Sequence, residues 1–219
     1  MRLFYVLFYH LGTALIAKPF LVLFTRWRIT GKEHCPQEGP LIVVANHLHL
    51  FDPPLLGASV SRRIVFMAKE EVFRHPLEGP LVRGYGAFPV RRAILDREAL
   101  RRAEQVLAEG LALGMFPEGT RSKAAQLQPG LSGAALLAIR SGAPILPVGI
   151  SGTDRLKSIS GLLSRPTVTV NIGPPFHVSQ RDGRVTKAQL TAATDLMMRR
   201  IAELLPEGYR GVYGGNGIS

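Results

Sequence analysis

PLIVVANHLHLFDPPLLGASV, residues 40–60, decides the fold class. Residues 40–45 form a short continuous apolar run, which is typical of a strand buried on both faces of a sheet. Asp52, followed by proline, predicts the start of a helix with Asp52 as its N-cap, because proline suits the first helical turn. The polar residues Asn46 and His47 lie in the loop between the strand and the helix. A strand that passes through a short loop into a helix is the building unit of an α/β sheet.

The same alternation of strands and helices continues towards the C-terminus. Short apolar runs predict further strands over 63–68, 111–116, 143–150 and 167–172. Helical patterns with start or stop signals cover 96–110, 133–142 and 186–205. Pro147 inside one predicted strand indicates an edge position or a bulge. Together these elements predict an α/β fold with a mixed, largely parallel sheet flanked by helices.

The composition favours an anionic partner. The formal net charge of the 219-residue chain is +11, which suits phosphorylated substrates, anionic lipid head groups or nucleic acid. A nucleic-acid partner is disfavoured, because the chain has no basic stripe with interleaved aromatic residues. The single cysteine, Cys35, rules out an intrachain disulfide and argues against a zinc site of the finger type.

The N-terminus is the most hydrophobic part of the chain. Residues 3–24 are apolar almost throughout, which is long enough for a membrane helix. Lys18 and Pro19 are expected to kink or break a helix, so two short helices that enter one leaflet fit as well as a single span. A buried hairpin in the protein core is the alternative. Basic residues beside an apolar anchor face the cytoplasm and attract anionic lipid. Three of them follow directly: Arg26, Arg28 and Lys32.

The chain is therefore expected to have three parts. Residues 1–30 form a hydrophobic, membrane-anchoring helical segment, and residues 31–207 form the α/β domain. Residues 208–219 are rich in glycine and form a flexible tail. This division predicts a peripheral or monotopic protein on the cytoplasmic face of a cell membrane, in contact with an anionic membrane surface.

His47 and Asp52 are the first candidates for chemistry. A neutral imidazole accepts a proton well near neutral pH, and a carboxylate on its other ring nitrogen fixes the tautomer and stabilises the imidazolium. Both residues follow a buried strand, which is where sites of α/β proteins lie. The alternative is that Asp52 only caps a helix and His47 is a polar loop residue.

A second candidate loop follows the predicted strand at 111–116. In MFPEGTRS, residues 115–122, Arg121 can bind a phosphate bidentately, and Gly119 allows the backbone to approach a ligand. Glu118 pairs with Arg121 or holds a substrate group in this interpretation. The alternative is a surface turn with an ordinary Glu–Arg ion pair.

Four stretches occur in a particular order: the histidine and aspartate of 46–52, GAFPVRR at 86–92, FPEGTRS at 116–122 and ILPV at 145–148. In this order they resemble the glycerolipid acyltransferase family, in particular the bacterial lysophosphatidic acid acyltransferases (1-acyl-sn-glycerol-3-phosphate acyltransferases). The resemblance covers roughly residues 40–175, and the hydrophobic N-terminus is similar to the membrane-anchoring segment of that family. The resemblance implies the glycerolipid acyltransferase fold and an acyltransferase domain over 31–207.

The resemblance also implies roles for individual residues. His47 matches the catalytic base and Asp52 its orienting carboxylate. Lys69 and Asn46 are expected to help with the oxyanion or to support the site, and Pro147 lines the acyl side. The residues expected to bind the acceptor phosphate are Arg121, Glu118, Gly119, Thr120 and Arg92. The sequence departs from the family's pattern at His49 and at Leu131–Ser132, which leaves the acceptor's head group open.

The implied reaction moves an acyl chain from acyl-CoA or acyl carrier protein to the sn-2 hydroxyl of 1-acyl-glycerol 3-phosphate, giving phosphatidic acid in phospholipid biosynthesis. The lysophospholipid acceptor and the acyl donor are the expected partners, with no metal, no cofactor beyond the co-substrate and no covalent acyl-enzyme. The alternatives are a different lysolipid or glycerol 3-phosphate as acceptor, or a non-catalytic basic module that binds membrane surfaces.

Overall fold

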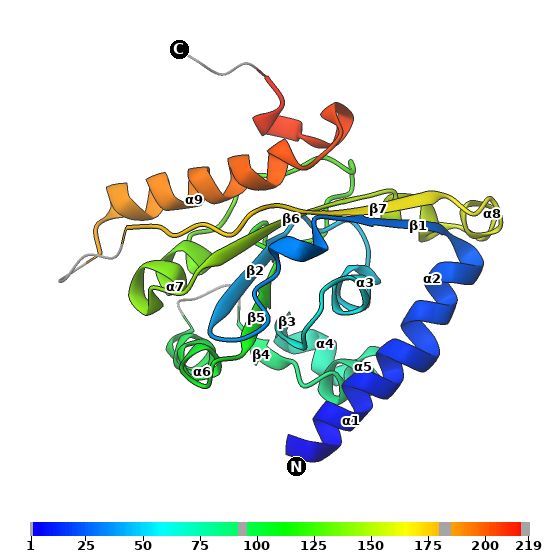
Figure 1. Ribbon diagram of the computed structural model, residues 1–219, viewed down its shortest axis with the longest axis horizontal. Coiled ribbons are helices and arrows are strands. Elements are labelled where there is room, and N and C mark those ends of the chain that lie inside the picture. Colours follow the sequence, from blue (N-terminus) through cyan, green and yellow to red (C-terminus); the bar gives the residue numbers. More distant parts are fainter. Residues whose placement is uncertain (1, 92–95, 180–184, 216–219) are drawn as a thin grey trace.

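A seven-stranded sheet forms the centre of the part of the chain that the computed structural model describes, which is residues 2–91, 96–179 and 185–215 (Figure 1). The strand order is β1-β7-β6-β2-β5-β3-β4. The strands are β1 (Arg26–Thr30), β2 (Leu41–Ala45), β3 (Ile64–Lys69), β4 (Phe88–Val90), β5 (Ala112–Met115), β6 (Ile145–Ser151) and β7 (Thr167–Ile172). The α-helices are α1 (Arg2–Gly12), α2 (Lys18–Phe24), α3 (Asp52–Ser59), α4 (Glu70–Arg74), α5 (Glu78–Gly84), α6 (Arg97–Ala108), α7 (Gly133–Ser141), α8 (Ile159–Leu163) and α9 (Lys187–Glu203).

The sheet is mixed and largely parallel, as predicted. Among the described strands only the β6–β7 pair is antiparallel, and every other neighbouring pair is parallel. The carboxyl ends of β2, β3, β4, β5 and β6 therefore lie at one edge of the sheet. We call this the histidine edge, because His47 follows β2 there. Strands β1 and β7 run in the opposite direction and begin at the same edge.

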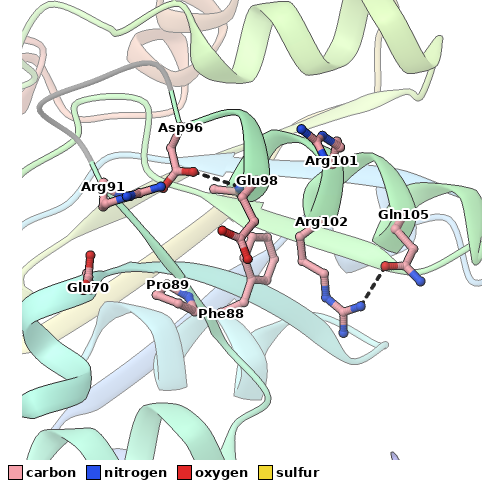
Figure 2. A pocket seen from close by; sticks show the side chains of 10 residues that line it. Glu70, Phe88, Pro89, Arg91, Asp96, Glu98, Arg101, Arg102 and Gln105 are labelled. Carbon is pink, nitrogen blue, oxygen red and sulfur yellow. Dashed lines mark hydrogen bonds and ion pairs between the residues drawn. The ribbon is translucent and has the colours of Figure 1, made fainter.

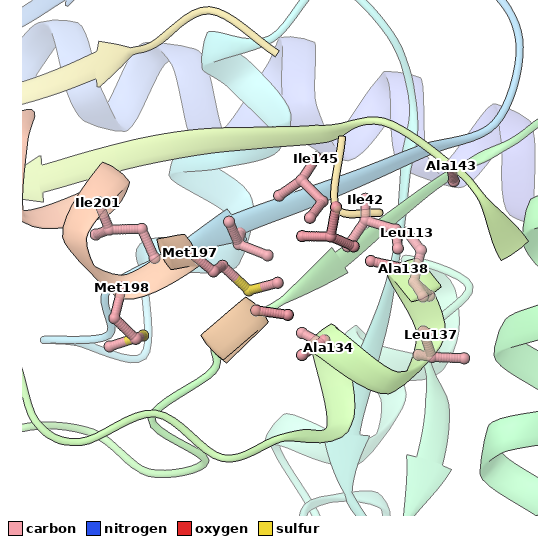
Figure 3. Packing of buried hydrophobic residues seen from close by; sticks show 14 of the residues in the cluster. Ile42, Leu113, Ala134, Leu137, Ala138, Ala143, Ile145, Met197, Met198 and Ile201 are labelled. Atoms are coloured by element: carbon pink, nitrogen blue, oxygen red, sulfur yellow. The ribbon is translucent and has the colours of Figure 1, made fainter. Parts of the chain in front are cut away.

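Two apolar layers cover the sheet. On one face α6, α7 and α9 pack against strand residues that include Ile42, Leu113 and Ile145, as Figure 3 shows for the α7 and α9 side. On the other face α3 and Leu21 of α2 pack against the alternate strand residues, such as Leu41 and Val43. The all-buried pattern of β2 follows from this arrangement, since both of its faces are covered.

The N-terminal segment is one continuous helix, so the expected break at Lys18 and Pro19 is wrong. Between α1 and α2 the chain forms a π-helical turn, Thr13–Ala17, and the Lys18 N–H donates to the Thr13 carbonyl five residues earlier. The wider turn lets the helix continue through Pro19, whose ring would clash with the carbonyl four residues before it in a regular α-helix. Residues 6–24 are long and apolar enough to cross a membrane by length and composition. They do not form a hairpin.

The expected domain boundary at residue 30 is also corrected. Residues 26–30 form β1, which pairs with β7 and is part of the central sheet. Its polar and apolar residues alternate because it is an edge strand with one face towards solvent.

The expected flexible tail does not hold for residues 208–213. Two 3₁₀ turns, Glu207–Tyr209 and Gly211–Tyr213, lie against the domain. The Tyr209 hydroxyl donates to Asp154 (2.9 Å), and its carbonyl accepts from the Leu127 N–H (2.8 Å). These contacts fix the segment although it is rich in glycine.

Pro147 lies in an interior strand, so the expected edge position is wrong. Strand β6 lies between β7 and β2, and Pro147 is opposite Val44 of β2. Its carbonyl accepts from the Gly173 N–H, directly after the last paired residue of β7. Val148 pairs with Ile172, and Ile145 pairs with Phe176. Between these two pairs the segment after β7 contains one residue more than β6 does. The predicted bulge is therefore present, and the missing N–H of proline falls at this irregular position.

Candidate active site

The loops after β2 and β5 meet at the histidine edge of the sheet. Strands β2 and β5 are parallel neighbours with Val44 opposite Met115, so the histidine loop and the FPEGTRS loop begin side by side. The Ser122 N–H donates to the His47 carbonyl (2.7 Å), which joins the two loops directly. The structure thus brings together two motifs that are about seventy residues apart in the sequence.

His47 and Asp52 form a hydrogen-bonded pair. His47 Nδ1 lies 2.8 Å from Asp52 Oδ2, and the exposed fractions of the two side chains are 12% and 0%. Because the carboxylate can only accept, Nδ1 carries the proton and Nε2 keeps its lone pair. The arrangement predicted from the five-residue spacing is the one that a general base requires.

Asp52 is not the helix cap that the sequence indicated. Helix α3 begins at Asp52, and its N-cap position is Phe51. The carboxylate instead turns back into the loop, where Oδ2 also accepts the N–H groups of Leu48 and His49, both at 2.7 Å. A hydrogen bond to the preceding loop replaces the expected bond to the helix, so Asp52 shapes the loop that carries His47.

The second carboxylate oxygen of Asp52 is buried without a hydrogen-bond partner among the described residues. A fully buried carboxylate with no cationic partner is costly, and a positive charge on the adjacent imidazole compensates it. Asp52 is therefore placed to stabilise His47 in the protonated state, which is the state of a base that has accepted a proton.

Glu118 holds the histidine loop and does not face a ligand. Its Oε1 accepts the His47 backbone N–H (2.7 Å), and its Oε2 accepts the Gln128 backbone N–H (3.0 Å) and side-chain amide (3.3 Å). Burial raises the pKa of the Glu118 carboxyl, and these hydrogen bonds oppose the rise. The expected pairing with Arg121 does not occur among the described residues, and both carboxylate oxygens of Glu118 are engaged by His47 and Gln128.

Phe116 is a site residue that the sequence analysis did not assign. Its ring stacks on the His47 imidazole, with ring centroids 4.1 Å apart and planes 19° from parallel. The Phe66 ring is also stacked with that of Phe116, with ring centroids 6.2 Å apart. The stacked rings restrict the imidazole plane. Only the position of Phe116, at the end of the predicted strand 111–116, could have indicated this contact.

Gly119 makes the turn of the FPEGTRS loop possible. Its φ is 70°, and a Cβ there would lie 2.5 Å from the Leu131 side chain. Its N–H donates to the Phe116 carbonyl (2.9 Å). The positive φ is the reason for glycine here, because other residues rarely adopt this backbone conformation.

Arg121 and Thr120 are exposed beside the histidine loop. The positive charges of Arg121 and Lys157 both contribute to the low pKa of His49, whose main cause is burial, while Asp52 opposes the shift. Arg121 and Lys157 therefore lie near the same loop residue. Among the described residues Arg121 has no ion pair or hydrogen bond, so its guanidinium is available to an anion.

The remaining predicted residues have different surroundings. Both polar side-chain atoms of Asn46 bond to Ile150 of β6, at 2.8 and 2.7 Å, so Asn46 supports the end of β2. Lys69, at the end of β3, is half-exposed and forms an ion pair with Glu71 (3.1 Å). Pro147 is buried within β6. Arg92 lies outside the described residues. Among the described residues no group of three or more His, Cys, Asp or Glu side chains could hold a metal ion.

A separate pocket lies beside β4 and the start of α6 (Figure 2). Arg91, Arg101 and Arg102 contribute to its lining, and Arg91 Nε lies 3.3 Å from Asp96 Oδ2. None of the residues that surround His47 lines this pocket. The pocket is thus distinct from the His47–Asp52 pair.

Known acyltransferases are similar to this chain in sequence. The family model described as Acyltransferase matches residues 26–151. The chain is 30% identical over 182 residues to a chloroplastic 1-acyl-sn-glycerol-3-phosphate acyltransferase, BAT2, of Brassica napus, covering 80% of this chain and 52% of that protein. It is 28% identical over 178 residues to the 1-acyl-sn-glycerol-3-phosphate acyltransferase of Bacillus subtilis, covering 81% and 87% of the two chains. The chain thus spans about half the length of its plant relative and most of its Bacillus relative.

A solved structure is also similar. The crystal structure of the 1-acyl-sn-glycerophosphate acyltransferase PlsC from Thermotoga maritima matches with a TM-score of 0.69 and 29% identity. The match covers 91% of this chain and 79% of that one. The similarity therefore extends over most of this chain.

Proposed function

Because the chain belongs to the acyltransferase family, we propose that it transfers an acyl chain from a thioester donor to the sn-2 hydroxyl of 1-acyl-glycerol 3-phosphate and so forms phosphatidic acid. The observation that carries the proposal is the His47–Asp52 pair, with Nε2 as the ring nitrogen that Asp52 does not engage. The donor is acyl-CoA or acyl carrier protein, and the step needs no metal and no cofactor beyond this co-substrate.

His47 acts as the general base in this reaction. Nε2 takes the proton of the acceptor hydroxyl as its oxygen attacks the thioester carbonyl, and the imidazolium that forms is stabilised by Asp52. When the tetrahedral intermediate collapses, the carbon–sulfur bond breaks and the imidazolium returns the proton to the departing thiolate. Lys69 is the proposed cationic neighbour of the oxyanion, for which one donor is typically worth about 3 kcal/mol.

Arg121 is the proposed ligand of the acceptor phosphate. It is exposed next to the histidine loop, and a guanidinium binds phosphate bidentately. Thr120 and Gly119 lie in the same turn, and Arg92 is proposed as a second phosphate ligand. Glu118 is left out of this set, because its carboxylate is engaged by His47 and Gln128.

The N-terminal helix is the proposed membrane anchor, on the cytoplasmic face. One side of it is buried against the domain through Tyr9, Ala17 and Leu21. The other side exposes large apolar side chains: Leu7, Leu11, Leu15, Ile16, Val22 and Leu23. A helix that packs along the domain and is apolar outside suits a position in the plane of the interface, where the acceptor also resides.

The test is a substrate panel with purified protein. Acyl-CoA and acyl carrier protein are each supplied with lysophosphatidic acid, other lysolipids or glycerol 3-phosphate, and the products are identified by mass spectrometry. Phosphatidic acid should be the main product, and His47→Ala should lower turnover by about 10²- to 10⁴-fold without a loss of thermal stability.

His177→Ala is the matched control, because His177 is exposed and follows β7 at the opposite edge of the sheet. It should retain full turnover. Equal product formation by the His47 variant and the wild type would refute the role of His47 as the base. No product from the wild type with any acceptor would favour a non-catalytic membrane module.

A further inference from the structure

Helix α8 presents an apolar pair to solvent. Ile159 and Leu163 are one helical turn apart, and their exposed fractions are 79% and 72%. The helix itself is well anchored. The Ser158 side chain caps it by accepting the Gly161 N–H, and Leu162 packs against the core. A fixed helix that holds two large aliphatic side chains outwards indicates a contact surface.

The end of α2 lies next to this helix. Arg165, two residues after α8, donates from Nη2 to the Val22 carbonyl of α2 (2.8 Å). Val22 and Leu23 are each 63% exposed. Figure 1 shows α8 beside the end of α2, on the side of the molecule away from α9. The apolar pair of α8 and the exposed face of the N-terminal helix are therefore neighbouring parts of one surface.

The histidine loop lies between these two elements. Phe20 of α2 contacts Phe51 of the loop, with ring centroids 4.6 Å apart. On the α8 side, Lys157 lies close enough to His49 to influence its pKa. Leu50, at the tip of the loop, is 43% exposed. The loop that carries His47 thus contacts α2 through Phe51, and its His49 lies near Lys157, two residues before α8.

The rim of this surface is basic. Three exposed cations border α8 and three more lie on or after α2; they are Arg155, Lys157, Arg165, Lys18, Arg26 and Arg28. Apolar side chains bordered by lysine and arginine match the interface of an anionic bilayer, which attracts cations near its surface and accepts apolar groups below it. Charge complementarity therefore favours an anionic lipid surface over a second copy of this basic chain.

We propose that α8 is a second membrane-contacting element, in which Ile159 and Leu163 insert into an anionic bilayer beside the N-terminal helix. A single helix lying in the interface leaves the domain free to rotate about the helix axis. A second point of insertion fixes that rotation and holds the approach to His47 against the lipid. The inference rests on the proposed function for the identity of the lipid substrate, whereas the contact itself is measured without turnover.

The first experiment compares Ile159→Asp/Leu163→Asp with the wild type on vesicles of phosphatidylcholine and phosphatidylglycerol. The double variant should keep its melting temperature, because both side chains are exposed, and its vesicle partition coefficient should fall by about tenfold or more. The matched control is Leu196→Asp/Val212→Asp, which carries the same charge at exposed apolar positions on α9 and the C-terminal turn. It should bind as the wild type does.

A second measurement places a dye on a cysteine introduced into α8. Cys35 is buried, so an environment-sensitive dye can be attached selectively to Ile159→Cys. Its emission should shift to the blue on the same vesicles, and lipids with a quencher on the acyl chain should quench it. The dye on Val212→Cys should show neither change.

Unchanged vesicle binding of the α8 variant, or a dye at position 159 that stays in water, would overturn the proposal. So would a wild-type dimer that the α8 variant converts to a monomer, as measured by light scattering, because the occupant would then be a second copy of the chain. If the protein lacks acyltransferase activity but the dye inserts into the bilayer, the proposed function is wrong and the proposed membrane contact of α8 is confirmed.

Discussion

His47 is held by contacts from its own loop and from the FPEGTRS loop. Asp52 holds its Nδ1, Phe116 stacks on its ring, and Glu118 accepts its backbone N–H. Each contact removes a degree of freedom from the imidazole or from its loop. A base that is held in this way loses little entropy when the acceptor hydroxyl arrives.

Glu118→Gln tests the positioning role. The amide has one acceptor oxygen, so its NH₂ group must face either the His47 N–H or the donors of Gln128. We expect the free energy of unfolding to fall by about 1–3 kcal/mol and kcat to fall with it. The KM for the acceptor should stay near the wild-type value. A large rise in this KM with unchanged kcat would return Glu118 to the phosphate-binding role that the sequence indicated.

Arg121→Ala tests the phosphate ligand. Hydrogen bonds to a charged group are worth about 1.5–3 kcal/mol, which corresponds to a rise in the acceptor KM of roughly tenfold to a hundredfold. The KM for the acyl donor should change little. The matched control is Lys123→Ala, an exposed neighbour with the same charge. Steady-state kinetics with each substrate varied decides the question, and an equal rise in both constants would contradict the assignment.

The sequence predicted the contact of His47 with Asp52 but not the contacts of Glu118 and Phe116 that support it. The spacing of His47 and Asp52 is local, so the chemistry of the two side chains was enough to suggest it. The contacts of Glu118 and Phe116 depend on the register of β2 against β5, which no local pattern contains. The expected role of Asp52 as a helix cap was wrong for the same reason. Whether its carboxylate accepts from the helix or from the preceding loop depends on the tertiary structure.

At the scale of the elements, helix starts with local signals were predicted well. Asp96 is the N-cap of α6 and accepts the Ala99 N–H, and Thr186 with Gln189 forms the capping box of α9. The strands β1 and β4 were missed, because edge strands lack the continuous apolar run of a central strand. For the N-terminus the sequence left one helix and two short helices open, because the π-helical turn before Pro19 has no recognised sequence signal.

The N-cap of α6 makes a prediction about pH. Hydrogen bonds from the Arg91 backbone, then from the Ala99 backbone, lower the pKa of Asp96 from 3.8 to about 2. Stability from a carboxylate with a lowered pKa is complete above the unfolded value and is lost as the pH falls through the folded value. Asp96→Asn should therefore be less stable than the wild type at neutral pH. The difference should disappear between about pH 4 and about pH 2.

Urea unfolding at several pH values measures this difference. Glu98→Gln, an exposed carboxylate on the first turn of the same helix, is the control and should show a small, nearly constant difference. A difference between Asp96→Asn and the wild type that is independent of pH would mean that the side chain acts by shape and not by charge.

At the scale of the whole molecule, the N-terminal helix joins the soluble core to the proposed lipid surface. The Tyr9 hydroxyl accepts the Ile64 N–H of β3, and burial is the main cause that raises its pKa to about 12. Tyr9 therefore stays a neutral phenol within the domain. Deleting the helix would remove these core contacts together with the apolar outer face, so truncation cannot separate anchoring from folding.

Substitutions on the two sides of the helix can separate them. The outer triple variant Leu11→Gln/Leu15→Gln/Val22→Gln changes exposed side chains, so its thermal stability should stay near that of the wild type while its partition onto anionic vesicles falls. Leu21→Ala changes a fully buried side chain and should lower the free energy of unfolding by about 2–5 kcal/mol. At temperatures where it is folded, it should still bind vesicles. The opposite pattern, with an outer variant that unfolds and an inner one that does not, would mean that the helix leaves the domain to cross the bilayer.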